Sequence, residues 1–390
     1  MFLSETQNVQ TCQCCRTEEI SLDRILITGG AGFIGSHVAD ELLRKGVRVR
    51  VLDNLCKQVH PERKRPSYLA SDVELIIGDV RDSRTIRRAL AGVDKVIHLA
   101  AMVGVGQSMY EISEYTQVNN VGTAVLLEAL VENPIQKLVI ASSMSIYGEG
   151  LYCDMDGTPH PGATRTPEQL KLNQWDPISS DGEVLHPVAT PEWKPPSLAS
   201  IYALSKFDQE QMCLMIGRAY GIPTVALRFF NVFGPRQALS NPYTGVLAIF
   251  AARLLNEQAP LIFEDGRQLR DFVSVYDVAR ACRLALESSA ADGQALNIGS
   301  GQRYSICEIA TGIAAALGKR ISPQISGKYR VGDIRHCFPD ISLSEKLLGY
   351  RPRVTLNEGL LDLAAWIETQ TAVDRFTVAQ DELTLRGLLV

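Results

Sequence analysis

Tyr202 and Lys206 are two side chains that could move a proton, and they stand four positions apart at the start of a helical pattern. Residues four apart on a helix share one face, so we expect the phenol and the ammonium to lie about one turn from each other. A nearby positive charge lowers the pKa of a phenol, which would make Tyr202 a general acid and base near neutral pH. On an exposed helix the same pair would have no chemical role, so the pattern needs support from a second element.

Ser142 and Ser143 provide that support, because they end the apolar run KLVIASS, which is typical of a buried strand. Folds with parallel strands bind their ligands at the carboxyl ends of those strands. A serine hydroxyl at this edge could hold the substrate oxygen whose proton Tyr202 takes. The residues together predict a proton-transfer site at the carboxyl edge of a sheet.

Three glycines, Gly29, Gly32 and Gly35, follow the apolar run RILIT directly and precede a helical pattern. In such a strand–loop–helix unit, glycines allow a tight turn, a close approach of the backbone to a pyrophosphate, and close packing of helix on strand. A glycine triplet alone could be no more than a tight turn. Asp53, an acidic residue at the end of the next apolar run, favours dinucleotide binding.

The carboxylate of Asp53 is suited to bind an adenosine ribose diol and would repel a 2′-phosphate, so NAD is favoured over NADP as cofactor. Asp79 ends the following apolar run and could contact the adenine amine, or it could cap a helix that starts near Asp82. The small residues that end the fourth run could face a cofactor or serve packing alone. The predicted cofactor contacts are Gly29, Gly32, Phe33, Ile34, Gly35, Asp53, Asn54, Asp79, Val80, Leu99, Ala100, Ala101, Tyr202 and Lys206.

Short runs rich in Val and Ile alternate with helical patterns from Arg24 onward, which predicts an α/β fold with a doubly wound, Rossmann-type parallel sheet. Helices are expected over 32–45, 114–132 and 201–220, and later ones over 245–256, after Val275 and after Leu356. We expect a flexible leader over 1–23, an NAD-binding domain over 24–231 with a proline-rich insertion at 150–198, a mainly substrate-binding lobe over 232–370 that partly returns to the sheet, and a tail over 371–390.

The composition argues against several classes of partner. The chain has 390 residues, 46% of them hydrophobic, and a net charge of −5, with no dense basic run beyond Arg63–Arg65, so nucleic acid is not expected. No apolar run is long enough for a membrane helix, and we expect a cytoplasmic protein. Most of the nine cysteines, such as Cys213, Cys282 and Cys307, stand singly in apolar segments, as reduced core thiols do. Cys12, Cys14 and Cys15 in the leader could bind metal, sense redox state or belong to a mobile tail.

Seven motifs distributed from Arg24 to about Trp366 resemble the extended short-chain dehydrogenase/reductases that act on nucleotide sugars; they are TGGAGFIG, HLAA, NNVGT, ASSMSIYG, YALSK, RFFNVFGP and RDFVSVYDVA. The resemblance implies that Ser143, Tyr202 and Lys206 are catalytic. It also implies that Asn119 supports the active-site helix and the lysine and belongs to the cofactor-binding residues. The substrate diphosphate is expected to be held by Asn231, Arg270 and Arg330. Each arginine could instead form a surface ion pair.

Met144 and Ser145 follow Ser143, where dehydratases of this family have Asp and Glu and decarboxylases usually keep the Glu. Reductases of the family commonly use NADPH, which Asp53 disfavours. The resemblance therefore implies a 4-epimerase that keeps its NAD, and several stretches resemble the epimerases acting on deoxythymidine-diphospho-L-rhamnose. The alternatives are a UDP-glucose/galactose-type 4-epimerase, a nucleotide-sugar 4-reductase and a nonenzymatic NAD sensor.

The insertion at 150–198 has a composition that bears on metal binding. Relatives often carry metal-binding Cys pairs in the insertion, but here only Cys153 and His160 remain, so we predict no zinc. The insertion could be a lid, a spacer or an oligomer contact.

The helices expected over 114–132 and 201–220 are apolar on more than one face. In relatives such helices form the four-helix bundle of a homodimer, whereas burial within one chain is the alternative.

Overall fold

The computed structural model describes residues 23–239, 241, 243, 245–330, 332–370, 374 and 376–389. Cys12, Cys14 and Cys15 lie outside these residues. Within them, no helix combines the length and the apolar character needed to cross a bilayer. Cys213 and Cys282 are free and buried, as expected of core thiols, and Cys307 is only partly buried.

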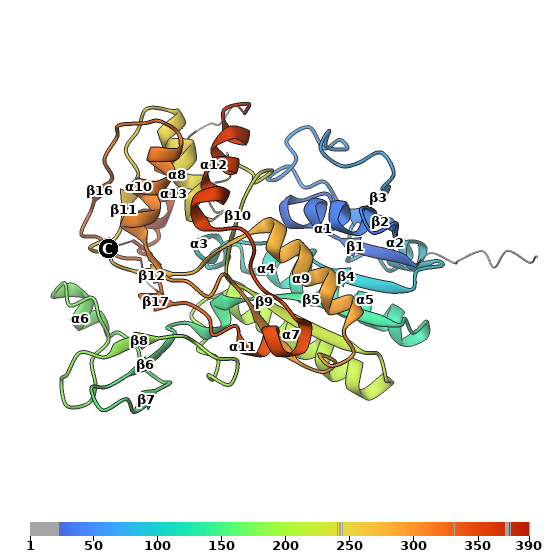
Figure 1. Ribbon diagram of the computed structural model, residues 1–390, viewed down its shortest axis with the longest axis horizontal. Helices are drawn as coiled ribbons and strands as arrows, with labels where there is room; N and C mark the ends of the chain where they lie inside the picture. The colour runs from blue at the N-terminus through green and yellow to red at the C-terminus, as the bar shows by residue number, and fades with distance from the viewer. Residues whose placement is uncertain are drawn as a thin grey trace, which may run out of the picture.

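A sheet of seven parallel strands forms the centre of the described part of the chain, in the order β14-β9-β5-β4-β1-β2-β3 (Figure 1). Its strands are β1 (Arg24–Thr28), β2 (Arg48–Asp53), β3 (Glu74–Ile77), β4 (Lys95–His98), β5 (Lys137–Ser143), β9 (Thr224–Phe229) and β14 (Ala295–Ile298). The order reverses beside β1, whose neighbours are β2 and β4, so the strand ends there open a crevice. The predicted doubly wound α/β fold is confirmed.

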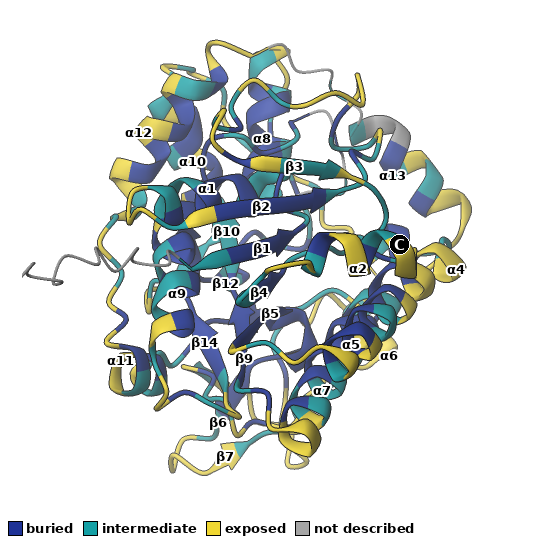
Figure 2. Ribbon diagram, turned by 90° about the vertical axis from the view of Figure 1, so that its right-hand side faces the viewer, coloured by how far each residue is buried: buried dark blue, intermediate teal, exposed yellow. Residues whose placement is uncertain are grey.

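Helices cover both faces of this sheet, and its strands are largely buried except for the edge strand β3 (Figure 2). One face packs on α1 (Phe33–Leu43), α9 (Val275–Glu287) and α11 (Ser342–Leu348). The other packs on α2 (Ser83–Leu90), α5 (Gly122–Glu132) and α7 (Ile201–Tyr220). The helix expected over 201–220 is confirmed by α7, because Ser200 caps its start and Gly221 ends it in the left-handed region.

The single α-helix expected over 114–132 is wrong in detail. This segment contains α4 (Ile112–Tyr115), a π-helical stretch at Thr116–Val121, and then α5. Wider π-helical turns are often found at functional sites. Here the π-helical stretch carries Asn119, which is fully buried.

A second lobe has a hydrophobic core of its own. Its helices are α8 (Val246–Leu255), α10 (Ile306–Ala316) and α12 (Leu356–Ile367), and its short strands are β10 (Asn231–Phe233), β11 (Leu261–Ile262), β12 (Leu269–Arg270), β13 (Phe272–Ser274), β15 (Tyr304–Ser305), β16 (Gln324–Ile325) and β17 (His336–Cys337). The chain returns from this lobe to the main sheet through α9 and β14. Two further helices are α3 (Val105–Ser108), which follows β4 in the chain, and α13 (Phe376–Leu385), which follows α12. Helix α13 falls in the stretch that the sequence indicated only as a tail.

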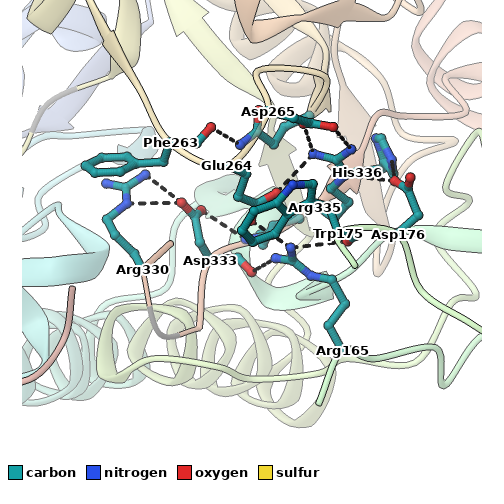
Figure 3. A network of polar contacts seen from close by, with 12 residues as sticks. Arg165, Trp175, Asp176, Phe263, Glu264, Asp265, Arg330, Asp333, Arg335 and His336 are labelled. Carbon is teal, nitrogen blue, oxygen red and sulfur yellow. Dashed lines mark hydrogen bonds and ion pairs between the residues drawn. The ribbon is translucent and has the colours of Figure 1, made fainter. Parts of the chain in front are cut away.

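The proline-rich insertion forms a small sheet of β6 (Leu151–Cys153), β7 (Pro159–His160) and β8 (His186–Val188), with the five-residue α6 (Pro167–Lys171). It forms no long helix, as its prolines predicted. A buried ion network anchors it to the second lobe: Arg165 of the insertion bonds Glu149 and Glu264, and Arg335 of the second lobe bonds Asp176 (Figure 3). The insertion is therefore a fixed part of the fold.

Candidate active site

A cavity of about 690 Å³ begins at the carboxyl ends of β1, β4 and β5 and extends beneath the second lobe. It brings together most of the residues singled out in the sequence. Those that line it are Gly29, Gly32, Phe33, Ile34, Gly35, Asp53, Asn54, Val80, Leu99, Ala100, Ala101, Ser143, Tyr202, Lys206, Asn231, Arg270 and Arg330. Two are not among the lining residues, Asp79 and Asn119.

The glycine loop lies where the strand order reverses, and its shape suits a diphosphate. Gly29 has a φ of +69°, and a Cβ there would lie 2.8 Å from the backbone nitrogen of Ala100. A Cβ on Gly35 would lie 2.5 Å from the carbonyl oxygen of Gly29, so α1 can pack on the loop only with glycine here. Gly32 is the N-cap of α1, and no side chain of the described residues caps the amides of the first turn. Those free N–H groups, together with the positive end of the helix dipole, form a cradle for a phosphate group.

Asp53 is held at the end of β2 by two backbone N–H groups, which donate to it from Ala31 at 3.0 Å and Leu55 at 2.9 Å. Asp79 lies beside it but is occupied by Arg81, whose hydrogen bonds lower the pKa of Asp79 to about 2. The amide of Asn54 also donates to Asp79. Asp79 thus orients Asn54, which lines the cavity.

The alternative interpretation of Asp79 as a helix cap is wrong. Asp82 is the N-cap of α2, where its carboxylate accepts a hydrogen bond from the backbone of Arg84. A cap must lie directly before the first helical turn, and Asp79 lies three residues too early.

Tyr202 and Ser143 lie next to each other in the cavity. The Oγ of Ser143 accepts hydrogen bonds from the backbone nitrogen and the hydroxyl of Ser145, at 3.1 and 3.0 Å, so its own proton is free for Tyr202. Burial raises the pKa of Tyr202 above its usual value, and the hydrogen bond with Ser143 opposes that rise. The expectation that Lys206 lowers this pKa is therefore wrong, because desolvation of the phenolate outweighs the attractions around it.

Lys206 is 3% exposed, and its Nζ donates to Oε1 of Gln209 at 2.7 Å. Burial lowers the pKa of Lys206 to about 8. Gln209 in turn donates to Thr123. The sequence reasoning missed Gln209, although its place three residues after Lys206 puts both side chains on one helix face.

Asn119 supports α7, although its contact is to Ser205 and not to Lys206. Its amide nitrogen donates to Ser205 at 2.9 Å and to the carbonyl of Met102, and its oxygen accepts from the backbone nitrogen of Met102. Asn119 therefore fixes the chain leaving β4 against α7, the helix that carries Tyr202 and Lys206.

A comparison with known proteins agrees with this geometry. Residues 25–169 and 180–299 match the model of the NAD dependent epimerase/dehydratase family. The chain belongs to this family. A dTDP-L-rhamnose 4-epimerase of Burkholderia thailandensis is 38% identical over 88% of this chain and 94% of its own length. The crystal structure of a UDP-glucose 4-epimerase of Thermus thermophilus in complex with NAD has a TM-score of 0.71 and 32% identity, covering 89% of this chain and all of that one. A structure of a UDP-glucose 4-epimerase from Thermotoga maritima with UDP-glucose gives a TM-score of 0.72 at 30% identity, covering 88% of this chain and 98% of that one.

This family member is an NAD-dependent isomerase, and the residues of its cavity fit the cofactor. The uncapped start of α1 can hold the diphosphate, and Asp53 can hold the adenosine ribose. Among the described residues, no group of three or more His, Cys, Asp or Glu side chains is placed to hold a metal ion. In the insertion, His160 bonds Asp154 at 3.1 Å.

The far end of the cavity, beneath the second lobe, contains buried polar atoms that have no partner among the described residues. Buried side-chain atoms on Asn231, Gln237 and Gln268, which line the cavity, have no hydrogen-bond partner in the described part of the chain. The same holds for His60, which lines the cavity on the side of Asp53. Leaving such a group unsatisfied costs about 1–3 kcal/mol, so polar groups of a ligand are expected there.

The two arginines at this end are already bonded to the protein. Arg270 donates to the carbonyls of Leu269, Ile334 and Arg335. Arg330 makes two hydrogen bonds to Asp333 and stacks on Phe263, with its guanidinium 4.9 Å from the ring centroid. Both line the cavity, where their charge can still attract a diphosphate.

Because two histidines are buried, we predict that the free energy of unfolding falls in weak acid. Burial lowers the pKa of His37 to about 4 and that of His98 to about 3. The unfolded chain binds protons at these histidines near pH 6.5 and the folded chain does not, so stability falls as pH drops through that value. We expect each histidine to cost about 2 kcal/mol between pH 7 and pH 5.

Urea unfolding at the two pH values measures this effect. His37→Asn should lose about 2 kcal/mol less than the unsubstituted protein over this interval. The matched control is His186→Asn, which removes an exposed imidazole instead of a buried one. Equal pH dependence in all three proteins would contradict the assignment to His37.

Proposed function

We propose that this protein is a nucleotide-sugar 4-epimerase that interconverts dTDP-L-rhamnose and dTDP-6-deoxy-L-talose through a transient 4-keto sugar. The observation that carries the proposal is the pair of residues after Ser143. Met144 and Ser145 both line the cavity, where elimination chemistry would need an acid and a base. The 38% identical relative named dTDP-L-rhamnose 4-epimerase supports the choice of sugar.

The catalytic residues have distinct tasks in this reaction. Tyr202 takes the proton of the C4 hydroxyl and later returns it, and Ser143 donates a hydrogen bond that stabilises the phenolate meanwhile. Lys206, held by Gln209, orients the cofactor ribose. NAD, when bound, supplies a reversible acceptor for the hydride on C4. Because the hydride returns to the keto sugar, no net oxidation occurs, and its return to the opposite face inverts the configuration at C4.

In this proposal, the diphosphate of the substrate lies at the far end of the cavity, beneath the second lobe. Arg270 and Arg330 provide positive charge there, and Asn231 provides a buried oxygen that no described residue of the protein bonds. Charge-assisted hydrogen bonds from arginine are among the stronger ones available to a phosphate.

The deciding experiment incubates purified protein, without added cofactor, with dTDP-L-rhamnose and follows the sugar by proton NMR. Formation of the C4 epimer supports the proposal. If only UDP-glucose is epimerised, the protein is instead a UDP-hexose 4-epimerase, the second candidate, which the two solved UDP-glucose 4-epimerases favour. If neither sugar reacts even after NAD is added, the epimerase proposal fails.

The proposal includes a homodimer formed through α7 and its neighbours. Leu204 and Met215 are 42% and 56% exposed, and their spacing of eleven residues puts them on one face of α7. Val121, at the end of the neighbouring π-helical stretch, is 47% exposed. Apolar side chains gathered on a helical layer are typical of a subunit interface. Leu204→Glu should therefore lower the mass measured by sedimentation equilibrium from twice that of the chain to that of one chain.

A further inference from the structure

The C-terminal helix α13 presents one face to the active-site cavity. Phe376, Ala379, Gln380 and Leu383 line the cavity, and Leu388 does so just after the helix. The spacing of the first four is that of a single helix face, and Leu385, on the opposite side, is 88% exposed. One face of α13 therefore covers the cavity, and the opposite face is exposed.

Contacts at both ends hold α13 in this position over the cavity. At one end, Glu382 accepts hydrogen bonds from Tyr110 and Tyr243, and Arg386 stacks on Tyr110 at 4.1 Å from the ring centroid. Tyr110 belongs to the chain that leaves β4 on the cofactor side. Helix α13 is therefore anchored to the part of the molecule that also carries Asn119 and the catalytic helix.

The other end of α13 packs on the second lobe. Arg253 of α8 pairs with Asp374 at 3.3 Å and lies 4.9 Å from the ring centroid of Phe376. Phe376 also packs on Phe263, the aromatic ring on which Arg330 stacks. The helix thus joins the two lobes, and it covers the cavity beside Arg330, one of the residues assigned to the diphosphate.

We propose that α13 is a wall of the substrate site, where Phe376 and Leu383 contact the nucleotide sugar and keep the 4-keto intermediate from escaping. This inference rests on the proposed 4-epimerase function. A sugar that loses a hydride from one face and regains it on the other has to turn within the site without leaving it. Phe376 and Leu383 cover the sugar and exclude water, and neither side chain has a polar atom that would hold the sugar in one orientation.

Leu383→Asp and Leu385→Asp form a matched pair that tests this proposal. Both put a carboxylate on the same helix, but Leu383 is 9% exposed and faces the cavity, whereas Leu385 is 88% exposed. For Leu383→Asp we expect the KM for the nucleotide sugar and the Kd of thymidine diphosphate to rise about tenfold or more. The Leu385→Asp protein should match the unsubstituted one in both.

Release of the intermediate is measured directly. The reaction is filtered to remove protein, the filtrate is treated with borodeuteride, and deuterium at C4 of the sugar is counted by mass spectrometry. The Leu383→Asp protein should release 4-keto sugar, and the unsubstituted and Leu385→Asp proteins should release none. Leu383→Met, which keeps the apolar volume, should restore retention, and melting temperatures show whether each variant is folded.

The outcomes separate the two proposals. If the folded Leu383→Asp protein has the KM, thymidine diphosphate affinity and retention of the Leu385→Asp protein, α13 is not a wall of the substrate site. Thymidine diphosphate binding does not depend on turnover. If the unsubstituted protein epimerises no sugar but Leu383→Asp still weakens the binding of thymidine diphosphate, the 4-epimerase proposal fails. The proposed contact of α13 with the nucleotide then stands.

Discussion

Replacing Tyr202 by phenylalanine is expected to lower the rate of epimerisation about a thousandfold, the usual effect of losing a general acid and base. The phenol is the group next to Ser143 that can take the hydroxyl proton of a substrate, and phenylalanine keeps the ring but not the oxygen. NMR of the sugar measures the rate. The NAD content of the purified variant should be unchanged, because the glycine loop and Asp53 do not depend on the phenol.

The control for this substitution is Tyr220→Phe, on the same helix. Tyr220 ends α7 and is 54% exposed, so the loss of its hydroxyl should leave the rate within a factor of two. If Tyr202→Phe keeps more than about a tenth of the activity, the proton goes to another group and the role assigned to Tyr202 is wrong.

Arg335→Met should destabilise the fold by about 3–5 kcal/mol, the usual cost of removing one partner from a buried ion network. Arg335 is 1% exposed and donates to three carboxylates: Glu264 at 3.0 Å, Asp176 at 2.8 Å, and Asp265 (Figure 3). Methionine fills part of the volume but leaves Glu264 buried with one cation fewer. The free energy of unfolding from urea titration measures the loss.

The matched control is Arg351→Met, because the side chain of Arg351 is 83% exposed and its ion pair with Glu345 is long, at 3.8 Å. That change should alter the free energy of unfolding by less than about 0.5 kcal/mol. Equal stability of the two variants would mean that the network does not hold the insertion to the second lobe. The network contacts Arg270 and Arg330 through Asp333, so Arg335→Met should also raise the KM.

The local parts of the site could be predicted from sequence because each depends on a few neighbouring residues. The spacing of Tyr202 and Lys206 determines their shared helix face, and the glycines at 29 and 35 are required by a turn and a helix packed within one βα unit. The alternation of apolar runs and helices likewise predicted the doubly wound sheet. Since the carboxyl ends of parallel strands meet at one edge, the position of Ser143 near Tyr202 followed.

The tertiary structure decided what depends on residues far apart in the chain. The pKa of Tyr202 rises because of burial, which no local spacing reveals, and Lys206 bonds Gln209 instead of acting on the phenol. The anchoring of the insertion by Arg335 and the position of α13 over the cavity arise from side chains more than a hundred residues apart. Sequence periodicity encodes which face of an element is apolar, and only the packed fold determines what that face covers.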